Sequence, residues 1–408
     1  MMIISRKTLG RASALLAALT LLILLSGCSV FDRFFGGDTT AAPVSTEGPS
    51  DESTPEPGAD TTEPGQSSDT LPPVTLPPDT TGGFISVTDP PVIHYYPDPL
   101  TGLKVTFDAS RVRPVAISVD NISAATPQSG IALADIVIEC MVENGISRLI
   151  LITNKYEGNT EVFGPVRSVR DYMVSLSAAF GTLLVGAGYS PTGYTSITEN
   201  AIDYIDGVHD RYAMSGFFRD PVRYEKSGYE HSLMITGQGI KALAAHNNYS
   251  LAANVREVFR FSDSAAIAGS DATHAVLTYS SYQQVQLIYS RKENAYYRYQ
   301  YGTKAHIDAA SGEQLSFTNV FILFADSAPI EGDTEGRITV EVTGTGSGYY
   351  LCGGKYIPIT WTRAGFSSPF SFTSDSGSFG VAAGKTFIAV VDSKLKDTSS
   401  IVLNYKMN

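Results

Sequence analysis

The segment RPVAISVD at residues 113–120 is the first of four short apolar runs that decide the fold of this chain. The other three are ADIVIE at 134–139, SRLILIT at 147–153 and TLLVGA at 182–187. Each run is rich in Val, Ile or Leu, and segments containing Gly or Pro separate the runs. Continuous apolar runs of this length are typical of strands buried on both faces of a sheet. The sequence therefore predicts a buried sheet at the centre of the chain.

Helix-spaced apolar residues lie between and after these runs, at 169–180, 192–205 and 239–246. Strands that alternate with helices favour a layered, mixed α/β architecture. We therefore predict an α/β domain over residues 93–250.

The pattern changes after residue 250. Apolar and polar residues alternate with a period of two, which is typical of half-buried strands, and Gly-rich turns separate the runs. The runs are 275–279, 285–289, 296–301, 320–324, 338–342, 349–352 and 386–391. With hardly any helical pattern among them, they predict a mainly antiparallel β domain over residues 251–408, folded as a sandwich or barrel. The expected fold class is α+β overall.

The first residues have the features of an export signal. Arg6, Lys7 and Arg11 precede an apolar run at 12–25, which is shorter than the roughly 20 residues that span a bilayer. The run ends in Leu25-Ser26-Gly27-Cys28, which resembles the lipobox of bacterial lipoproteins. This resemblance implies that residues 1–27 are a signal peptide that is removed. It also implies that Cys28 is lipidated and anchors the chain to the membrane, at the outer, extracytoplasmic face of the plasma membrane.

Residues 28–92 differ from the rest in composition. They are mainly Ser, Thr, Pro, Gly and acidic residues, too poor in bulky apolar side chains to offset the entropy of ordering, so we expect a disordered tether. Residues 29–92 hold 11 of the 41 acidic residues and one of the 29 basic residues, whereas residues 93–408 hold 30 and 25. The body is therefore nearly balanced within a chain of net charge −12. This charge argues against nucleic acid as a partner.

Three arginines form the first candidate site. Arg167 and Arg170 follow Gly164-Pro165 at the point where a helix is predicted to begin, and Arg148 is the second residue of the third apolar run. Cations at a helix N-terminus oppose the helix dipole, so their presence beside free backbone N–H groups indicates a site for a carboxylate or phosphate. Alternatively, the arginines pair in a structural network with nearby carboxylates. Those carboxylates are Asp135, Glu139 and Asp171.

Polar residues at the predicted strand ends form the second candidate site, because ligands of open α/β sheets bind at strand ends. Asp120, Asn121, Glu139 and Glu143 lie there. Asn121 is grouped with the arginines as a ligand-binding candidate. Two of the carboxyl groups could flank a glycosidic bond as acid and base, although Asp120-Asn121 could instead form an Asx turn.

His231 is a further candidate base, with Arg219, Asp220 and Arg223 close to it in sequence. The alternative is an ordinary hydrogen-bonded loop histidine. Asp120, Glu139 and His231 are therefore the catalytic candidates if the protein is an enzyme.

No metal and no cofactor is expected, since the six histidines show no ligand spacing and no phosphate-binding loop precedes a predicted helix. Cys140 and Cys352 fall in predicted strands of different halves, where two buried thiols are expected rather than a disulfide. The many tyrosines of the second half could stack on sugars or simply fill a sheet.

Several sequence motifs occur in the order of a known family. The first half contains PLTG at 99–102, RPVA at 113–116, PQSG at 127–130, ADIV at 134–137 and GPVRSVR at 164–170. The second half contains HID at 306–308, GSGYY at 346–350, ITW at 359–361 and GKT at 384–386. Over residues 97–392 the chain resembles the YerB-like lipoprotein family, a two-part domain of unknown function. The resemblance implies a two-part body and no known chemistry.

These features lead to one main functional hypothesis and two alternatives. The main hypothesis is a non-enzymatic binding or scaffold lipoprotein at the cell envelope, which contacts a cell-wall polymer or an envelope protein. The first alternative is a cell-wall hydrolase, and the second is a solute-binding protein that closes around a small molecule.

Overall fold

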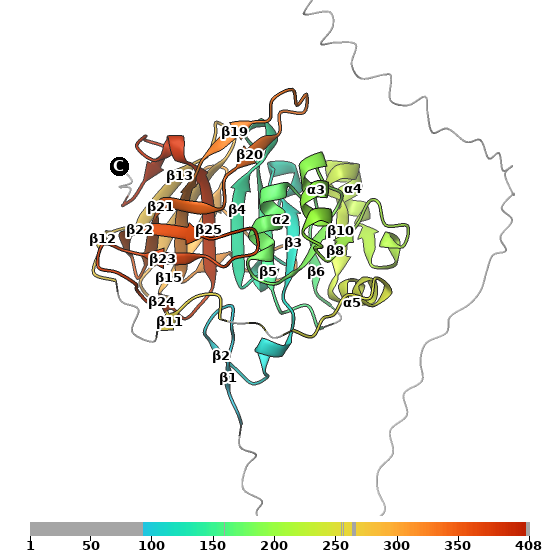
Figure 1. The fold of residues 1–408 in the computed structure, drawn as a ribbon, viewed down its shortest axis with the longest axis horizontal. Helices are drawn as coiled ribbons and strands as arrows, with labels where there is room; N and C mark the ends of the chain where they lie inside the picture. Colours follow the sequence, from blue (N-terminus) through green and yellow to red (C-terminus); the bar gives the residue numbers. More distant parts are fainter. Residues whose placement is uncertain (1–92, 159, 254, 256, 263–266, 405–408) are drawn as a thin grey trace, which may run out of the picture. The chain divides into compact units, whose positions relative to one another are not determined.

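The computed structural model describes residues 93–158, 160–253, 255, 257–262 and 267–404. The signal peptide, Cys28 and the tether predicted at 28–92 lie outside the described residues. The described residues belong to one compact unit (Figure 1).

The four apolar runs form neighbouring strands of the central sheet. They are β3 (Val115–Asp120), β4 (Ile136–Met141), β5 (Ser147–Thr153) and β7 (Leu183–Gly186). β3 and β4 both pair antiparallel with β5, whereas β3 pairs parallel with β7, and β7 with β8 (Tyr204–Asp206). β3, β4, β7 and β8 therefore run in one direction, and their carboxyl ends lie at the same edge of the sheet.

Four α-helices accompany the strands of the first half. They are α2 (Asp171–Ala178), α3 (Pro191–Glu199), α4 (Pro221–Ser227) and α5 (Gly237–His246). The helix predicted at 192–205 is too long, because Ala201 adopts a positive φ of 48° and residues 204–206 form β8. The expected helices at 169–180 and 239–246 correspond to α2 and α5.

All seven alternating runs of the second half contain strands. β13 (His274–Thr278), β14 (Gln284–Ser290), β15 (Ala295–Gln300), β16 (Lys304–Ala305), β17 (Ser316–Phe317) and β26 (Ile401–Val402) form an antiparallel sheet. β12 (Ser270–Asp271), β18 (Asn319–Ala325), β21 (Gly344–Cys352), β22 (Lys355–Arg363), β23 (Ser371–Thr373) and β25 (Thr386–Asp392) join the central sheet. The α+β fold class is confirmed.

Short strands complete the fold. β1 (Tyr96–Pro97) pairs with β2 (Lys104–Val105), β11 (Phe261–Ser262) with β24 (Val381–Ala382), and β19 (Ser327–Pro329) with β20 (Ile338–Val340). β6 (Val162–Phe163), β10 (Leu233–Thr236) and β9 (Phe217–Arg219) form a small antiparallel sheet.

One sheet connects the two halves of the body. β25 of the second half pairs in parallel with β4 of the first half and, on its other side, with β18. The order across the sheet is β12-β22-β21-β18-β25-β4-β5-β3-β7-β8. The predicted boundary at residue 250 lies between α5 and β11. The central sheet contains strands from both sides of this boundary.

Both faces of the central sheet are covered. On one face, Ala116 and Ile138 pack with Met173 and Leu176 of α2. The opposite face packs against α5 and against the antiparallel sheet of the second half, through residues that include Ile240, Leu243, Leu277 and Leu287. This double coverage explains why the four runs are continuously apolar. Among the described residues, no helix is long and apolar enough to cross a membrane.

Candidate functional site

Charged side chains gather at the carboxyl edge of the central sheet. We call Asp120, Glu143, Arg148, Arg167, Arg170, Glu230 and His231 the carboxyl-edge cluster. The backbone N–H of Arg167 donates to the carbonyl of Ser118 (2.9 Å), and that of Ala187 donates to the carbonyl of Arg167 (3.0 Å). Arg167 is thus held between the ends of β3 and β7, and Arg170 immediately precedes α2.

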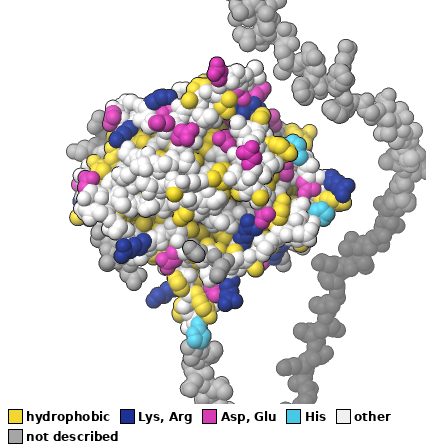
Figure 2. All heavy atoms as spheres, in the orientation of Figure 1, with side chains coloured by type: hydrophobic (Ala, Val, Ile, Leu, Met, Phe, Trp, Pro, Cys, Tyr) yellow, Lys and Arg dark blue, Asp and Glu magenta, His cyan; other side chains and the backbone are white. Residues whose placement is uncertain are grey.

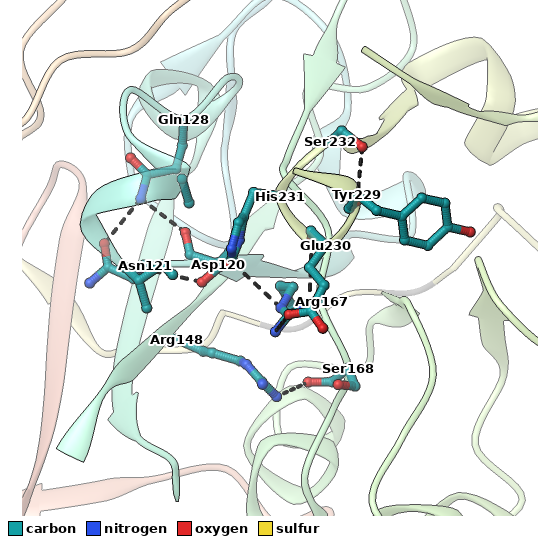
Figure 3. A network of polar contacts seen from close by, with 12 residues as sticks. Asp120, Asn121, Gln128, Arg148, Arg167, Ser168, Tyr229, Glu230, His231 and Ser232 are labelled. Carbon is teal, nitrogen blue, oxygen red and sulfur yellow. Dashed lines mark hydrogen bonds and ion pairs between the residues drawn. The ribbon is translucent and has the colours of Figure 1, made fainter. Parts of the chain in front are cut away.

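Asp120 ends β3 and is buried. Its Oδ2 lies 2.8 Å from Nδ1 of His231 and 3.4 Å from Nε of Arg167 (Figure 3). The carboxylate therefore fixes one ring nitrogen of His231. The basic neighbours considered from sequence are engaged elsewhere: Arg219 donates to the carbonyl of Tyr229 and Arg223 to that of Ala125.

Glu143, just after β4, is shared by two arginines. Its Oε2 accepts from Nε of Arg170 at 3.0 Å, and its Oε1 is bound by Nη2 of both Arg170 and Arg148, the latter at 3.2 Å. Burial acts to raise the pKa of Glu143, but hydrogen bonding from Arg170 and the charges of both arginines outweigh it and lower the pKa. Glu143 is therefore a carboxylate at neutral pH.

Positive charge exceeds negative charge inside the carboxyl-edge cluster. Arg148 is 2% exposed, and burial followed by the neighbouring charge of Arg170 lowers its pKa to about 10. The three guanidinium groups face only two largely buried carboxylates, Asp120 and Glu143, because the third, Glu230, is 69% exposed. Nε of Arg148 is buried and has no hydrogen-bond partner among the described residues, and Nε of Arg167 is buried with only the 3.4 Å ion-pair contact to Asp120. The cluster thus has more buried N–H donors than acceptors.

The alternative pairing expected from sequence does not occur. Asp135 pairs with Lys155, Glu139 pairs with Arg298, and Asp171 accepts a hydrogen bond from the hydroxyl of Thr192 at 3.0 Å. The arginines do form the partly buried network that this alternative predicts, but the carboxylates in it are Glu143, Asp120 and Glu230.

Glu139 lies apart from the carboxyl-edge cluster, in the interface between the two halves. It is fully buried, and Nη2 of Arg298 from β15 donates to its Oε2 at 2.7 Å. Its Oε1 accepts from Asn121, Ser147 and Gln283 at 2.6–3.0 Å. Both carboxylate oxygens are therefore satisfied within the protein, so Glu139 presents no oxygen to a substrate. Asn121, a ligand-binding candidate, is also fully buried and donates to Glu139.

A closed ring of hydrogen bonds surrounds this ion pair. Arg298 donates from Nη1 to Nδ1 of His306, so Nε2 of His306 donates to Oε1 of Gln128 at 2.8 Å. Gln128 donates to Oδ1 of Asn121 (3.1 Å), which donates to Glu139 (3.0 Å). Burial, and then the charge of Arg298, hold the pKa of His306 well below its ordinary value. We call Glu139, Asn121, Gln128, Arg298 and His306 the interface ring.

No local sequence pattern connects Arg298, His306 and Gln128 with Glu139. A signal was present, because Glu139 interrupts the apolar run ADIVIECM and Arg298 points to the buried face of an alternating strand. A charge at such a position requires a buried partner. The sequence could not identify that partner, which lies 159 residues away.

The structure also places the two cysteines of the body and the adjacent tyrosines of β15. Cys140 and Cys352 are buried thiols rather than a disulfide, and burial, followed by the nearby charge of Glu139, raises the pKa of Cys140 to about 12. Within the described ranges, no group of three or more His, Cys, Asp or Glu side chains could hold a metal ion. Tyr296 is buried and Tyr297 is partly exposed, as their adjacent positions on a strand require.

Comparison with known proteins gives one consistent result. Residues 100–250 match the family described as "Protein of unknown function (DUF3048) N-terminal domain", and residues 275–388 match its C-terminal domain. A Bacillus subtilis (strain 168) protein named "Putative lipoprotein YerB" is 30% identical over 296 residues, which cover 72% of this chain and 85% of that protein. The crystal structure of the YerB protein from Bacillus subtilis matches with a TM-score of 0.65 at 28% identity. That match covers 75% of this chain and 99% of the other.

Proposed function

Because the chain belongs to the two-part DUF3048 family and is similar to the Bacillus subtilis protein YerB, we propose that it is a membrane-anchored binding lipoprotein of the cell envelope. The proposed ligand is an anionic group of a cell-wall polymer, bound at the carboxyl-edge cluster. An envelope protein that presents the same group is the alternative partner.

Two features support the proposed location. The sequence Leu25-Ser26-Gly27-Cys28 has the form of a lipobox, and the relative in Bacillus subtilis is itself named as a lipoprotein. The lipid on Cys28 would hold the chain at the outer face of the plasma membrane. A tether of the predicted kind would then allow the body to reach the wall, since a flexible coil of about 60 residues spans on the order of 40 Å on average.

The observation that carries the binding proposal is the excess of buried positive charge. Three guanidinium groups meet two largely buried carboxylates. Among the described residues, Nε of Arg148 has no hydrogen-bond acceptor, and Nε of Arg167 has only the 3.4 Å ion-pair contact to Asp120. A buried donor without an acceptor costs about 1–3 kcal/mol. A carboxylate or phosphate oxygen would remove that cost and balance the charge.

A co-sedimentation experiment tests this proposal. The soluble chain starting at Ser29 is mixed with isolated cell wall, and bound protein is measured. We expect the wild type to sediment and Arg167→Ala to bind at least tenfold more weakly, because a charge-assisted hydrogen bond contributes about 1.5–3 kcal/mol. Arg111→Ala is the matched control, since Arg111 is highly exposed and forms one surface ion pair. A lower melting temperature with unchanged binding would instead show that Arg167 is only structural.

A cell-wall hydrolase is the second candidate, and the contact between Asp120 and His231 favours it. An aspartate that holds Nδ1 of a partly exposed histidine leaves Nε2 oriented to act as a general base. The same sedimentation assay, scored for released sugar or peptide, distinguishes the two functions. Release that His231→Gln abolishes would establish the hydrolase, whereas intact wall with bound protein would exclude it.

A further inference from the structure

Two groups of partly or largely exposed aromatic rings lie next to residues of the carboxyl-edge cluster. The first group, which we call the Tyr189 shelf, consists of Tyr189, Tyr194 and His209. Tyr189 stacks on His209 with ring centroids 4.6 Å apart and lies 5.0 Å from Tyr194, which is 50% exposed. Oδ2 of Asp206 at the end of β8 lies 2.7 Å from Nδ1 of His209 and so orients this half-exposed ring. The shelf is thus fixed rather than free to rotate.

The backbone that carries the Tyr189 shelf pairs with the backbone of residues 167–169. A β-carbon at Gly188 would lie 3.4 Å from Cε1 of His209 and 3.9 Å from Cβ of Ser168. The carbonyl of Ser168 accepts a hydrogen bond from Nη1 of Arg148, as Figure 3 shows. Ser168 therefore lies between the shelf and the guanidinium group of Arg148.

The second group, which we call the Tyr229 shelf, consists of Arg219, Tyr224 and Tyr229. The guanidinium carbon of Arg219 lies 3.6 Å from the ring centroid of Tyr229, which is 61% exposed, and Tyr224 packs edge-on at 6.1 Å. The next residue, Glu230, contacts Arg167 at 3.3 Å. In Figure 3 the ring of Tyr229 extends outward from the cluster, beyond Glu230.

The two shelves combine flat rings with polar groups. Figure 2 shows histidine, basic, acidic and hydrophobic side chains close together along the right-hand side of the molecule, the side where Figure 1 places the helices of the first half. Rings that carry Asp, Arg and Glu neighbours suit a ligand with one apolar face and many hydroxyl groups, which is the surface of a pyranose. A purely apolar ligand surface would leave the polar groups beside these rings without hydrogen-bond partners.

We propose that the ligand of this site is an acidic saccharide, whose sugar rings stack on the Tyr189 and Tyr229 shelves while its carboxylate binds at Arg148 and Arg167. This inference rests on the proposed function, because the anion site supplies the charge and the shelves supply the class of ligand. The site would bind a saccharide that carries a carboxylate, and it would bind a neutral saccharide or a free carboxylic acid only weakly.

Titration calorimetry with three probes tests this. The probes are the disaccharide N-acetylglucosaminyl-N-acetylmuramic acid, which has a free carboxylate, the neutral oligosaccharide chitotetraose, and lactate. We expect the acidic disaccharide to bind at least tenfold more tightly than either other probe. Tyr189→Ala and Tyr229→Ala should each weaken its binding about tenfold, since an aromatic contact contributes on the order of 1 kcal/mol or more. Tyr95→Ala, at an exposed tyrosine near β1, is the control.

The outcomes separate this inference from the proposed function. If Arg167→Ala weakens binding of the disaccharide but both tyrosine variants bind like the wild type, the saccharide inference is wrong and the anion site remains. If chitotetraose binds as tightly as the acidic disaccharide, the acidic part of the inference is wrong. If none of these variants changes binding, both proposals fail. Tyr229→Phe should retain binding, because stacking does not need the hydroxyl group.

Discussion

Glu139 and Arg298 are both fully buried and lie 2.7 Å apart in the interface ring. Removing one member of a buried ion pair leaves an uncompensated charge, which typically costs about 3–5 kcal/mol. We therefore expect Arg298→Met to lower the free energy of unfolding by about that amount in urea titrations.

The double variant Glu139→Gln/Arg298→Met provides the control. With neither charge present, its destabilisation should be clearly smaller than the sum of the two single losses. Additive losses would contradict direct coupling between the two side chains.

His306 should make the stability of the protein depend on pH. Burial and the charge of Arg298 hold its pKa well below 6.5 in the folded protein, so the unfolded chain binds the additional proton. Above about pH 6.5, His306 takes nothing from the free energy of unfolding. As the pH falls below that value, protonation of the unfolded chain lowers the free energy of unfolding by up to about 1.4 kcal/mol per pH unit.

Urea unfolding between pH 8 and pH 5 measures this dependence. His306→Gln keeps an acceptor for Arg298 and a donor for Gln128, and its stability should fall less steeply below pH 6.5 than that of the wild type. His94→Gln, at an exposed position, should keep the wild-type slope. Identical slopes for the wild type and His306→Gln would show that His306 is not held neutral by folding.

At the scale of single residues, the local sequence predicts where a charged residue lies in the fold better than it predicts which residue it pairs with. Asp120, Arg167 and Arg170 were expected at strand and helix ends, and they lie there because the strand direction and the helix start are locally encoded. The sequence does not identify the residues that pair with them. Glu143 was considered as an acid, whereas its carboxylate is occupied by Arg148 and Arg170. Such pairings depend on distances across the fold that no local pattern contains.

At the scale of elements, periodicity identified the buried strands and most helices. The four apolar runs and the seven alternating runs all contain strands, because burial on one or both faces directly sets the pattern of a strand. β22 was not among the predicted strands. It contains Pro358, which argues against an internal strand, yet Ile359, Trp361 and Arg363 alternate toward the buried side.

Tertiary pairing also overrode a local preference at the end of α3. The apolar spacing continues to Ile205, but the helix ends at Glu199 and residues 204–206 pair with β7. A three-residue strand adjacent to a helix gives too short a pattern to be recognised alone. The pairing matters for function, since Asp206 at the end of β8 then orients His209.

At the scale of the whole molecule, the sequence predicted two parts but not how they connect. β4 and β25 pair in register from Ile136 with Thr386 to Cys140 with Val390, about 250 residues apart in the chain. Apolar strands resemble one another, so composition alone cannot select this pairing. The interface ring lies in the same contact region and adds the polar specificity that apolar strands lack.

The shared sheet predicts that the first half does not fold by itself. A fragment of residues 93–250 would expose the backbone edge of β4, the apolar face that packs on Leu277 and Leu287, and the charge of Glu139 without Arg298. We expect this fragment to lack a cooperative thermal transition and the near-UV circular dichroism of packed aromatic residues. Residues 93–404 should show both, and mixing the fragment with residues 251–404 should recover part of the signal. A fragment that melts cooperatively near the temperature of residues 93–404 would mean that the β4–β25 ladder and the interface ring only join two independently stable domains.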